Sequence, residues 1–452
     1  MLKLRLNILK KLLIIIIILF LRLELYSFEI DSALSFDFSI RYRFELLDGM
    51  NIKNYGDKGQ NAIGNLNDKI LLQRVIAGVT YRFTEDINFA FHLYDARAFG
   101  WSLRNSINRN YFKSVNPKDS SEYYIMNPNE QFFEIYDMYL NIKNIIPNLS
   151  MTLGRQKLYF GDYRVMGPGD WRNTGRWTWD ALRFTYNTET ININFWMGGT
   201  KIQDPERTSI PFTETEYWGG GMYSRIKILE SLALEPFVIF KKNGSAHYIR
   251  DIDLRRYWIG ARLVDSNLYG FDYDFNFTKE FGKEKGKNID AYGLFARVGY
   301  SFKFLPFKPL LSIRYTYATG GRQQDEEINQ FDPAYGAQDK YYGWMNIVTW
   351  SNLDDREVVL ELFPTRQFWI EIKYNDFYVP VPEGNTLLGT LKLKEGSKHL
   401  GSEFNIFSRY NLNKNWQFTF VVGYFFVGEV LPIDNQPAKD AYYIGTQVLF
   451  NI

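Results

Sequence analysis

Arginine, aspartate and tryptophan crowd one short run of the sequence, residues 154–184. This run, GRQKLYFGDYRVMGPGDWRNTGRWTWDALRF, holds five arginines, one lysine, three aspartates and three tryptophans. A guanidinium group keeps its charge at physiological pH and binds a carboxylate through two parallel hydrogen bonds. The run therefore predicts contact with anionic groups, and its tryptophans would either stack on sugar rings or face a membrane interface.

Other kinds of chemistry find little support. The chain has no cysteine, and its three histidines, His92, His247 and His399, are too scattered for a metal cluster. A hydrolase built on a barrel, such as a lipase or deacylase, would need a serine–histidine pair with an orienting acid, and no spacing singles one out. GGGMYS at 219–224 lacks the lysine of a nucleotide-binding loop. We expect no enzyme activity and no cofactor.

The N-terminus has the order of a secretory signal. Four basic residues precede the apolar run LLIIIIILFL at 12–21. This run is about half of the roughly 20 residues that a membrane-spanning helix needs, and the basic-then-apolar order is typical of a cleaved signal. We expect a signal peptide over residues 1–27 and one domain over residues 28–452. The alternative is a signal anchor retained in the inner membrane.

The elements that would position the charged side chains are strands, because the remaining sequence alternates with a period of two. In SFDFSIRYRFEL (35–46), apolar residues alternate with aspartate, serine, arginine and glutamate. Similar alternation recurs at 256–263, 292–302 and 311–318. The candidate strands run about 10–14 residues, the length that a tilted strand needs to cross a bilayer.

Eighteen segments fit this description, and together they predict a closed sheet. Short connections follow the even-numbered segments, and mostly long ones follow the odd-numbered segments, as in an outer-membrane barrel with both termini in the periplasm. Backbone groups inside a bilayer find no water, so a sheet can span it only when closed. The expected fold is all-β: a single transmembrane antiparallel β-barrel of about 18 strands. The segments are 34–46, 70–83, 87–98, 131–143, 149–158, 176–187, 190–200, 215–228, 232–242, 252–265, 267–280, 288–303, 309–319, 354–364, 366–378, 398–411, 415–428 and 440–450.

A barrel of this size is too wide to be filled by its own side chains, so its lumen should be polar. Alternation places arginines on the inner face at positions 41, 43, 74, 82, 225, 256, 262, 297, 314 and 409, and acids at 37, 45, 272, 274, 371 and 403. The arginines outnumber the acids, which favours a passage for anions. The alternative is that these charges pair across the lumen and only solvate it.

The charged run resembles a signature of the alginate-export (AlgE-like) outer-membrane family. The matching residues are Gly154, Arg155, Gln156, Gly161, Asp162, Arg164, Asp170, Trp171, Arg172, Asn173, Thr174, Gly175, Arg176, Asp180 and Arg183. YDARAFG (94–100), FDPAYGAQDKYYGWMNIVTWSNL (331–353) and GSKHLGSEFNI (396–406) are similar to three further family stretches in the same order. The matched pieces cover roughly 80 residues.

The resemblance implies an 18-stranded barrel whose electropositive constriction passes an anionic polyuronate. The resemblance assigns a place in this constriction most directly to Arg155, and more weakly to Arg74 and Arg97. The glycines of the loop 159–175 would let it fold back into the pore and bring its arginines to the constriction. A strand bulge near the rim would be needed, because Asp180 and Arg183 fall on opposite faces. The expected constriction residues are Arg74, Arg97, Arg155, Arg164, Arg172, Arg176, Asp180, Arg183, Arg262, Arg297, Arg314, Arg409 and Glu403.

The sequence thus predicts a monomeric channel of the outer membrane, inserted by the barrel-assembly machinery. It would pass an alginate-like polysaccharide or small acidic solutes by passive diffusion, and would bind no nucleic acid. The alternatives are a general porin without strong selectivity and a plugged barrel that acts as an adhesin or structural protein. Acidic loop runs, such as 325–327 and 354–355, would bind Ca²⁺ only loosely.

Overall fold

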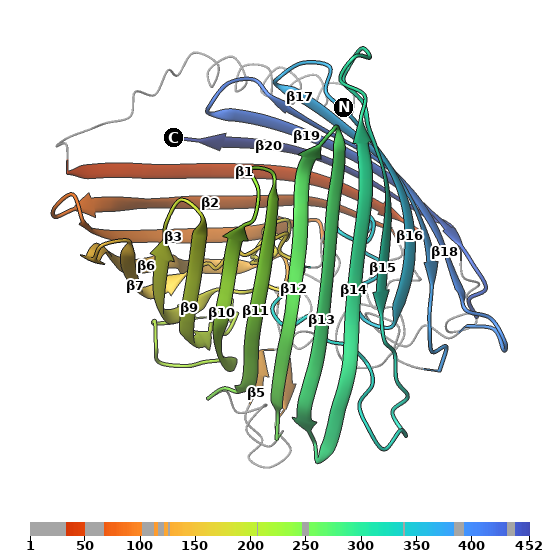
Figure 1. Ribbon diagram of the computed structural model, residues 1–452, viewed down its shortest axis with the longest axis horizontal. Coiled ribbons are helices and arrows are strands. Elements are labelled where there is room, and N and C mark those ends of the chain that lie inside the picture. The colour runs from red at the N-terminus through yellow and green to blue at the C-terminus, as the bar shows by residue number, and fades with distance from the viewer. Residues whose placement is uncertain are drawn as a thin grey trace, which may run out of the picture.

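Eighteen long strands close into one cylinder in the computed structural model (Figure 1). Every long strand pairs antiparallel with the next long strand along the chain. The first also pairs with the last, so that the sheet has no free end. The structure describes residues 33–49, 67–101, 113–115, 122–124, 127–205, 207–245, 253–337, 340–383, 393–431 and 439–452. The expected signal peptide lies outside these ranges.

The strands match the eighteen segments expected from alternation, with small differences at their ends. They are β1 (Leu34–Asp48), β2 (Asp68–Arg82), β3 (Ile87–Phe99), β6 (Gln131–Ile146), β7 (Leu149–Gln156), β8 (Trp179–Asn187), β9 (Ile191–Thr200), β10 (Tyr217–Lys227), β11 (Leu232–Asn243), β12 (Arg255–Leu268), β13 (Phe271–Glu284), β14 (Lys287–Ser301), β15 (Leu310–Ala318), β16 (Leu353–Leu362), β17 (Phe368–Tyr378), β18 (His399–Asn411), β19 (Trp416–Val427) and β20 (Ala441–Asn451). A small hairpin of β4 (Lys113–Val115) and β5 (Glu122–Tyr124) in a loop was not expected.

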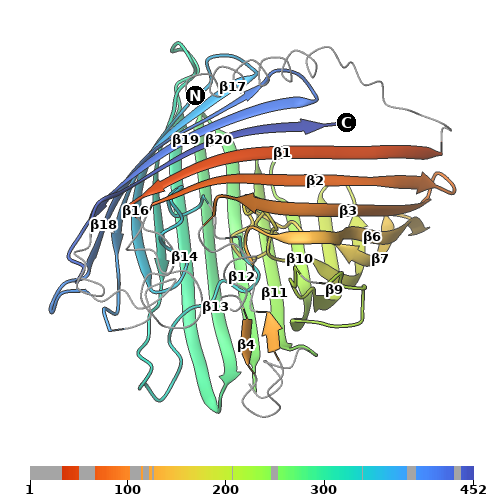
Figure 2. The same ribbon diagram turned by 180° about the vertical axis from the view of Figure 1, so that it is seen from behind.

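The two ends of the cylinder differ in their connections. One end, here the turn end, carries the connections after β2, β6, β8 and the other alternate strands, as well as the start of β1 and the finish of β20. These two terminal strands lie side by side in Figures 1 and 2. The opposite loop end carries mostly long connections. Its exception is the tight β13–β14 turn, where Lys285 and Gly286 both adopt positive φ, as a two-residue hairpin requires.

The two faces of the wall have the polarity that alternation predicts. On β1, Tyr42 and Phe44 are each 41% exposed on the outside, whereas Arg41 and Arg43 are 4% and 2% exposed on the inside. Residues of the apolar outer face, such as Phe195, Phe277 and Ile313, would contact lipid acyl chains. Among the described residues, no helix has the length and apolar character needed to cross a membrane.

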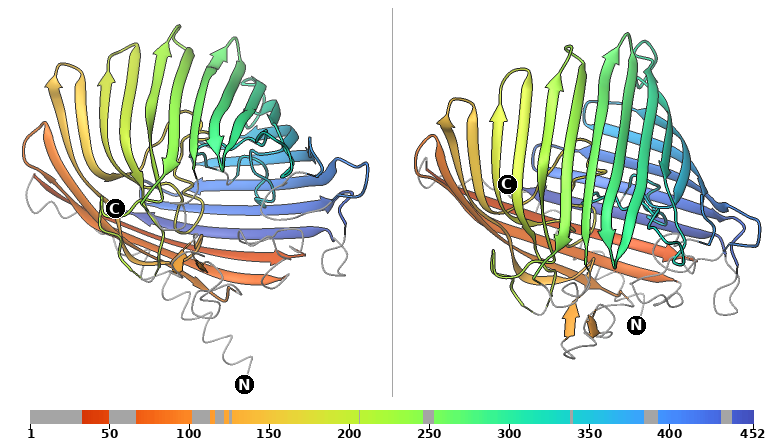
Figure 3. Two further views of the ribbon diagram at one scale, coloured as in Figure 1. Left: turned by 90° about the horizontal axis from the view of Figure 1, so that it is seen from below. Right: turned by 60° about the horizontal axis from the view of Figure 1, so that its bottom comes forward.

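Two connections at the loop end fold into the cylinder. We call them the first inner segment (residues 157–178) and the second inner segment (residues 328–337 and 340–352). In Figure 3, the teal trace of the second inner segment lies within the ring of strands. Their buried aromatic residues, among them Phe160, Trp177, Tyr335 and Trp350, form one hydrophobic core with inward side chains of the wall. The main core of this barrel therefore lies inside it.

Candidate functional site

The first inner segment crosses the lumen from one wall to another. Phe160 stacks on Tyr223 of β10 at 5.1 Å between ring centroids, and Arg164 lies 3.6 Å from the ring centroid of Phe295 on β14. Trp171 contacts Phe407 of β18. These strands lie far apart around the cylinder, so only a segment inside it can reach all three. The expected inward fold of this loop is confirmed.

One asparagine ties the first inner segment to the wall. Asn173 has no exposed surface, and its Nδ2 donates to the carbonyls of Gln73, Arg97 and Asn129 at 2.8–3.1 Å. Its Oδ1 accepts from Arg41 of β1. Arg41 also donates to the carbonyls of residues 170 and 172, and Arg43 donates to that of Trp171. Two arginines of the inner wall thus hold backbone carbonyls of the segment.

A charged cluster fixes the same segment next to these contacts. Lys157 Nζ lies 2.6 Å from Asp170 Oδ1 and 2.8 Å from the hydroxyl of Tyr136, and the hydroxyl of Tyr159 donates to Asp170 Oδ2. Burial alone would raise the pKa of Asp170, but Lys157 and Arg74 hold it well below its ordinary value. Asp170 is therefore a stable anion inside the lumen.

The second inner segment is held by charged residues of the opposite wall. Lys241 of β11 lies 3.3 Å from Asp332 and donates to the carbonyl of Ala334 at 2.7 Å. Burial would raise the pKa of Asp332, but Lys241 and Arg256 keep it below its ordinary value. Further along, the backbone nitrogen of Met345 donates to Glu403 Oε1 at 2.9 Å. Glu403 is thus an anchor for this segment.

Tryptophans in the first inner segment and at the start of β8 belong to the inner core. Trp179 has no exposed surface and contacts Trp196 and Tyr335, while Trp177 packs edge-on against Tyr335 at 5.2 Å. Trp171 packs against Trp344 at 5.1 Å. The expectation that these rings stack on sugars or form an interfacial girdle is wrong for Trp177 and Trp179, because neither contacts the outer face or an open surface.

Arginines on the inner wall between β11 and β17 are mostly ion-paired. Arg262 donates to both oxygens of Asp274 at 2.7 Å and to Glu235 at 2.9 Å. Arg297 and Arg314 are paired in register on β14 and β15. Arg314 lies 3.1 Å from Glu361, and Arg297 lies 3.5 Å from Asp272 and 3.7 Å from Glu361. These arginines lie on the lumen face, as expected, but with carboxylates beside them.

Further acids on the inner wall alter the charge balance. Alternation in the sequence had not identified them as lumen residues, but Glu235 and Glu361 pair with arginines, and Glu280 pairs with Arg256. Asp137 lies 2.5 Å from the ring of His92. The inner wall therefore carries cations and acids interspersed, and the described strands do not show the expected excess of arginines over acids.

Several inner arginines make no ion pair within the described part of the chain. Arg41 is held by backbone carbonyls and Arg82 lies exposed at the turn end. The half-buried ones are Arg74 on β2, Arg183 on β8 and Arg409 on β18. Arg183 donates to Asn194 Oδ1 at 2.6 and 3.0 Å. Arg409 lies over the rings of Trp369 and Phe407, with its guanidinium carbon 5.5 Å from each centroid. Because Arg74 already acts on Asp170, Arg183 and Arg409 are the inner guanidinium groups best able to attract an anion.

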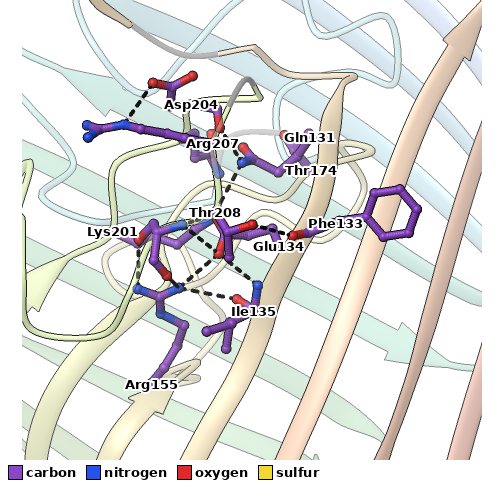
Figure 4. Close-up of polar contacts among 12 residues, drawn as sticks. Gln131, Phe133, Glu134, Ile135, Arg155, Thr174, Lys201, Asp204, Arg207 and Thr208 are labelled. Carbon is purple, nitrogen blue, oxygen red and sulfur yellow. Dashed lines mark hydrogen bonds and ion pairs between the residues drawn. The ribbon is translucent and has the colours of Figure 1, made fainter.

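Arg155 and Asp180 lie on the outer parity of the wall. They are partners in register, and they share a face with Leu153 and Tyr186, which are 43% and 39% exposed on the outside. Arg155 makes two hydrogen bonds with Asp180 at 2.7 and 2.9 Å. A third joins it to Glu134 at 3.1 Å (Figure 4). All three residues are buried. The expectation that Arg155 and Asp180 line the lumen is wrong.

A segment of the β9–β10 connection hides this pair, and we call residues 207–213 the covering segment. β7 pairs with β6 only as far as Met138, because the chain then turns inward, so β6 residues 131–137 have no β7 partner. Thr208 Oγ1 donates to the carbonyl of Phe133, Ser209 donates to Glu134, and the backbone nitrogen of Phe212 donates to Asp180. The covering segment thus fills the place where β7 stops.

Lys201 completes the buried cluster under the covering segment. Its Nζ lies 3.2 Å from Glu134 Oε2, and Figure 4 shows it beside Arg155. Burial lowers the pKa of Lys201 to about 8, against the attraction of Glu134. The cluster of two cations and two carboxylates therefore seals the wall and is not accessible to a solute.

Arg97 also lies outside the lumen. It is paired in register with Gln73, which bonds to the outward Tyr42, and it shares its face with Leu93 and Phe99. Its guanidinium group pairs with Asp95 at 2.6 Å and lies over the rings of residues 132 and 133. The expectation that Arg97 belongs to a constriction is wrong, because strand alternation turns it outward.

The arginines within the first inner segment have separate surroundings. Arg164 is buried and pairs with Asp162 at 3.1 Å, in contact with Phe295 and Tyr341. Arg176 is partly exposed, lies over the ring of Trp177 and is 3.9 Å from Glu216. Arg172 is half-buried. They do not form one cluster, and their expected part in a constriction stays a prediction.

Comparison with known proteins agrees with this architecture. A family model described as alginate export matches residues 32–445. No curated protein matches the sequence. Among solved structures, OccAB2 of Acinetobacter baumannii has a TM-score of 0.59 at 11% identity, covering 93% of this chain and 98% of that chain. OpdK of Pseudomonas aeruginosa with vanillate has 0.57 at 9%, covering 93% and 98%. OccK11 (OpdR) of the same organism has 0.54 at 8%, covering 92% and 96%. At these identities the likeness is one of fold.

Proposed function

The chain belongs to the alginate-export family, and from that premise we propose that its lumen passes an acidic polysaccharide or small carboxylates. Its family and fold are those of outer-membrane barrels that act in transport by passive diffusion. The protein is therefore an outer-membrane channel embedded in the lipid bilayer. The proposal concerns what this channel selects.

The observation that supports anion passage is the charge of two inner arginines, Arg183 and Arg409. Most other inner guanidinium groups are neutralised by carboxylates within 4 Å, whereas these two have no such partner among the described residues, and Arg74 acts on Asp170. A wide lumen with low-dielectric walls strengthens the attraction of fixed charges for ions of opposite sign. Anions are thus the solutes that these side chains favour.

Planar-bilayer recordings test the proposal. The full-length barrel should conduct with a preference for anions, and replacing both Arg183 and Arg409 with glutamine should reduce that preference. A matched control is Arg356→Gln, which removes an exposed arginine on the outer face of β16 that pairs with Asp354.

Three outcomes would contradict the proposal. Cation preference in the unmodified protein would exclude an anion channel, and equal block by polyuronate and neutral oligosaccharides would favour a general porin. A closed pore under all voltages would favour the plugged barrel that the inner aromatic core makes conceivable.

A further inference from the structure

Four inward side chains form a row across the last strands of the barrel. Trp369 of β17 is in register with Arg409 of β18, Arg409 with Thr419 of β19, and Thr419 with Gln447 of β20. Each is on the inner face. Adjacent strands lie about 4.8 Å apart, so the row extends over roughly 14 Å of the lumen wall.

Polar atoms in this row lack hydrogen-bond partners. The Trp369 Nε1, Arg409 Nε, Thr419 Oγ1 and Gln447 Oε1 atoms are all buried, and none has a partner in the described structure. Thr419 and Gln447 are 5% and 8% exposed. A buried polar group without a partner costs about 1–3 kcal/mol, so a bound ligand that supplies partners is favoured there.

The row differs in charge from the neighbouring part of the wall. Arg314, two strands before Trp369, lies 3.1 Å from Glu361 and 3.9 Å from Glu371. Arg409 has no carboxylate within 4 Å in the described structure and lies over the rings of Trp369 and Phe407. Glu371 attracts it only from beyond that distance, so an incoming carboxylate can form the direct pair with Arg409.

We propose that Trp369, Arg409, Thr419 and Gln447 form a subsite for a carboxylate flanked by hydroxyl groups, as in one uronate residue. Arg409 binds the carboxylate. Trp369 and Thr419 donate to ring or hydroxyl oxygens, and Gln447 accepts from a hydroxyl. This subsite rests on the proposed function, since it gives the passing anion a specific binding position on the lumen wall.

Single-channel block by two named trimers tests the subsite. Trigalacturonate should dwell longer in the unmodified channel than maltotriose, which is neutral. Arg409→Gln should shorten the dwell of trigalacturonate about tenfold, the effect of losing one charge-assisted hydrogen bond, and should leave maltotriose unchanged. Gln447→Leu should shorten the dwell of both trimers, because it removes a hydroxyl acceptor and no charge. Arg356→Gln, on the outer face of β16, is the control.

The possible results separate the subsite from the proposed function. If the unmodified channel holds both trimers equally, the proposed function and the subsite both fail. If it discriminates, and Arg409→Gln and Gln447→Leu keep the same dwell times, only the subsite fails. Should Arg409→Gln not fold, Gln447→Leu and Thr419→Val decide the matter, since unchanged dwell in these two variants also overturns the subsite.

Discussion

Arg155 illustrates a buried cation whose hydrogen bonds are all made. Its guanidinium group bonds to Asp180, Glu134 and Ser209 and has no exposed surface. Removing one partner of such a pair leaves an uncompensated buried charge, at a cost of about 3–5 kcal/mol. Arg155 therefore acts in stability and not in selectivity.

Arg155→Gln should lower the stability of the folded barrel by about 3–5 kcal/mol and leave the anion preference of the folded fraction unchanged. Urea unfolding in detergent, followed by the mobility shift of folded barrels on gels, measures the first effect. Arg207→Gln is a matched control, because Arg207 lies exposed on the covering segment, with ion pairs to Asp204 and Glu214. A changed ion selectivity in Arg155→Gln would contradict its place in the wall.

Asp170 should give stability a dependence on acid pH. Its pKa is lowered on folding, so its contribution is complete above its unfolded pKa and is lost as the pH falls through the range below about 4. The stability difference between the unmodified protein and Asp170→Asn should therefore shrink as the pH falls from about 5 to about 2. A difference that stays constant would show that Asp170 is not paired on folding.

Alternation in sequence predicts side-chain faces only where a strand is regular. Arg297 and Arg314 lie in long strands and face inward, as expected. Arg155 sits next to Gly154, which has a φ of 130°, and near the end of β7, where the outer face is covered by another loop. No local sequence pattern predicts that the covering segment lies over Arg155, because its residues are about fifty positions away in the chain.

At the scale of elements, the first inner segment depends on Asn173. Four hydrogen bonds join this side chain to β1, to β2, to β3 and to the carbonyl of Asn129, which lies just before β6. The bonds to β1 and β2 span 132 and 100 positions of sequence. The glycines of the segment predict that it can turn inward, but contacts over such separations could not be predicted from one sequence.

Asn173→Ala should loosen the first inner segment without opening the wall. The loss of these buried bonds should cost about 3 kcal/mol, and the open-channel current should become noisier, because the segment samples more than one position. Urea unfolding and single-channel noise measure the two effects. Asn187→Ala, at the turn end of β8, is a control of the same chemistry on an exposed site. Quiet currents in Asn173→Ala would show that other contacts hold the segment.

At the scale of the whole molecule, the tryptophans divide between lipid and lumen. Trp218 is 38% exposed on the outer wall, and Trp416 shares the outer face of β19 with Phe418. Trp179 and Trp258 are buried inside. Replacing Trp218 and Trp416 with phenylalanine should remove most fluorescence quenching by brominated lipids, whereas replacing Trp179 and Trp258 should leave it. Quenching that persists without Trp218 and Trp416 would contradict the assignment of the two faces.

The contacts of the first inner segment bear on the order in which the barrel is assembled. Trp171 packs against Trp344 and against Phe407 of β18, and both of these residues lie more than 170 positions after it in the chain. When the hairpins enter the bilayer in chain order, this segment must wait undocked until the late strands arrive. Its aromatic side chains remain exposed to water during that interval. Closure of the cylinder and exclusion of water from its aromatic core therefore become one late, cooperative event.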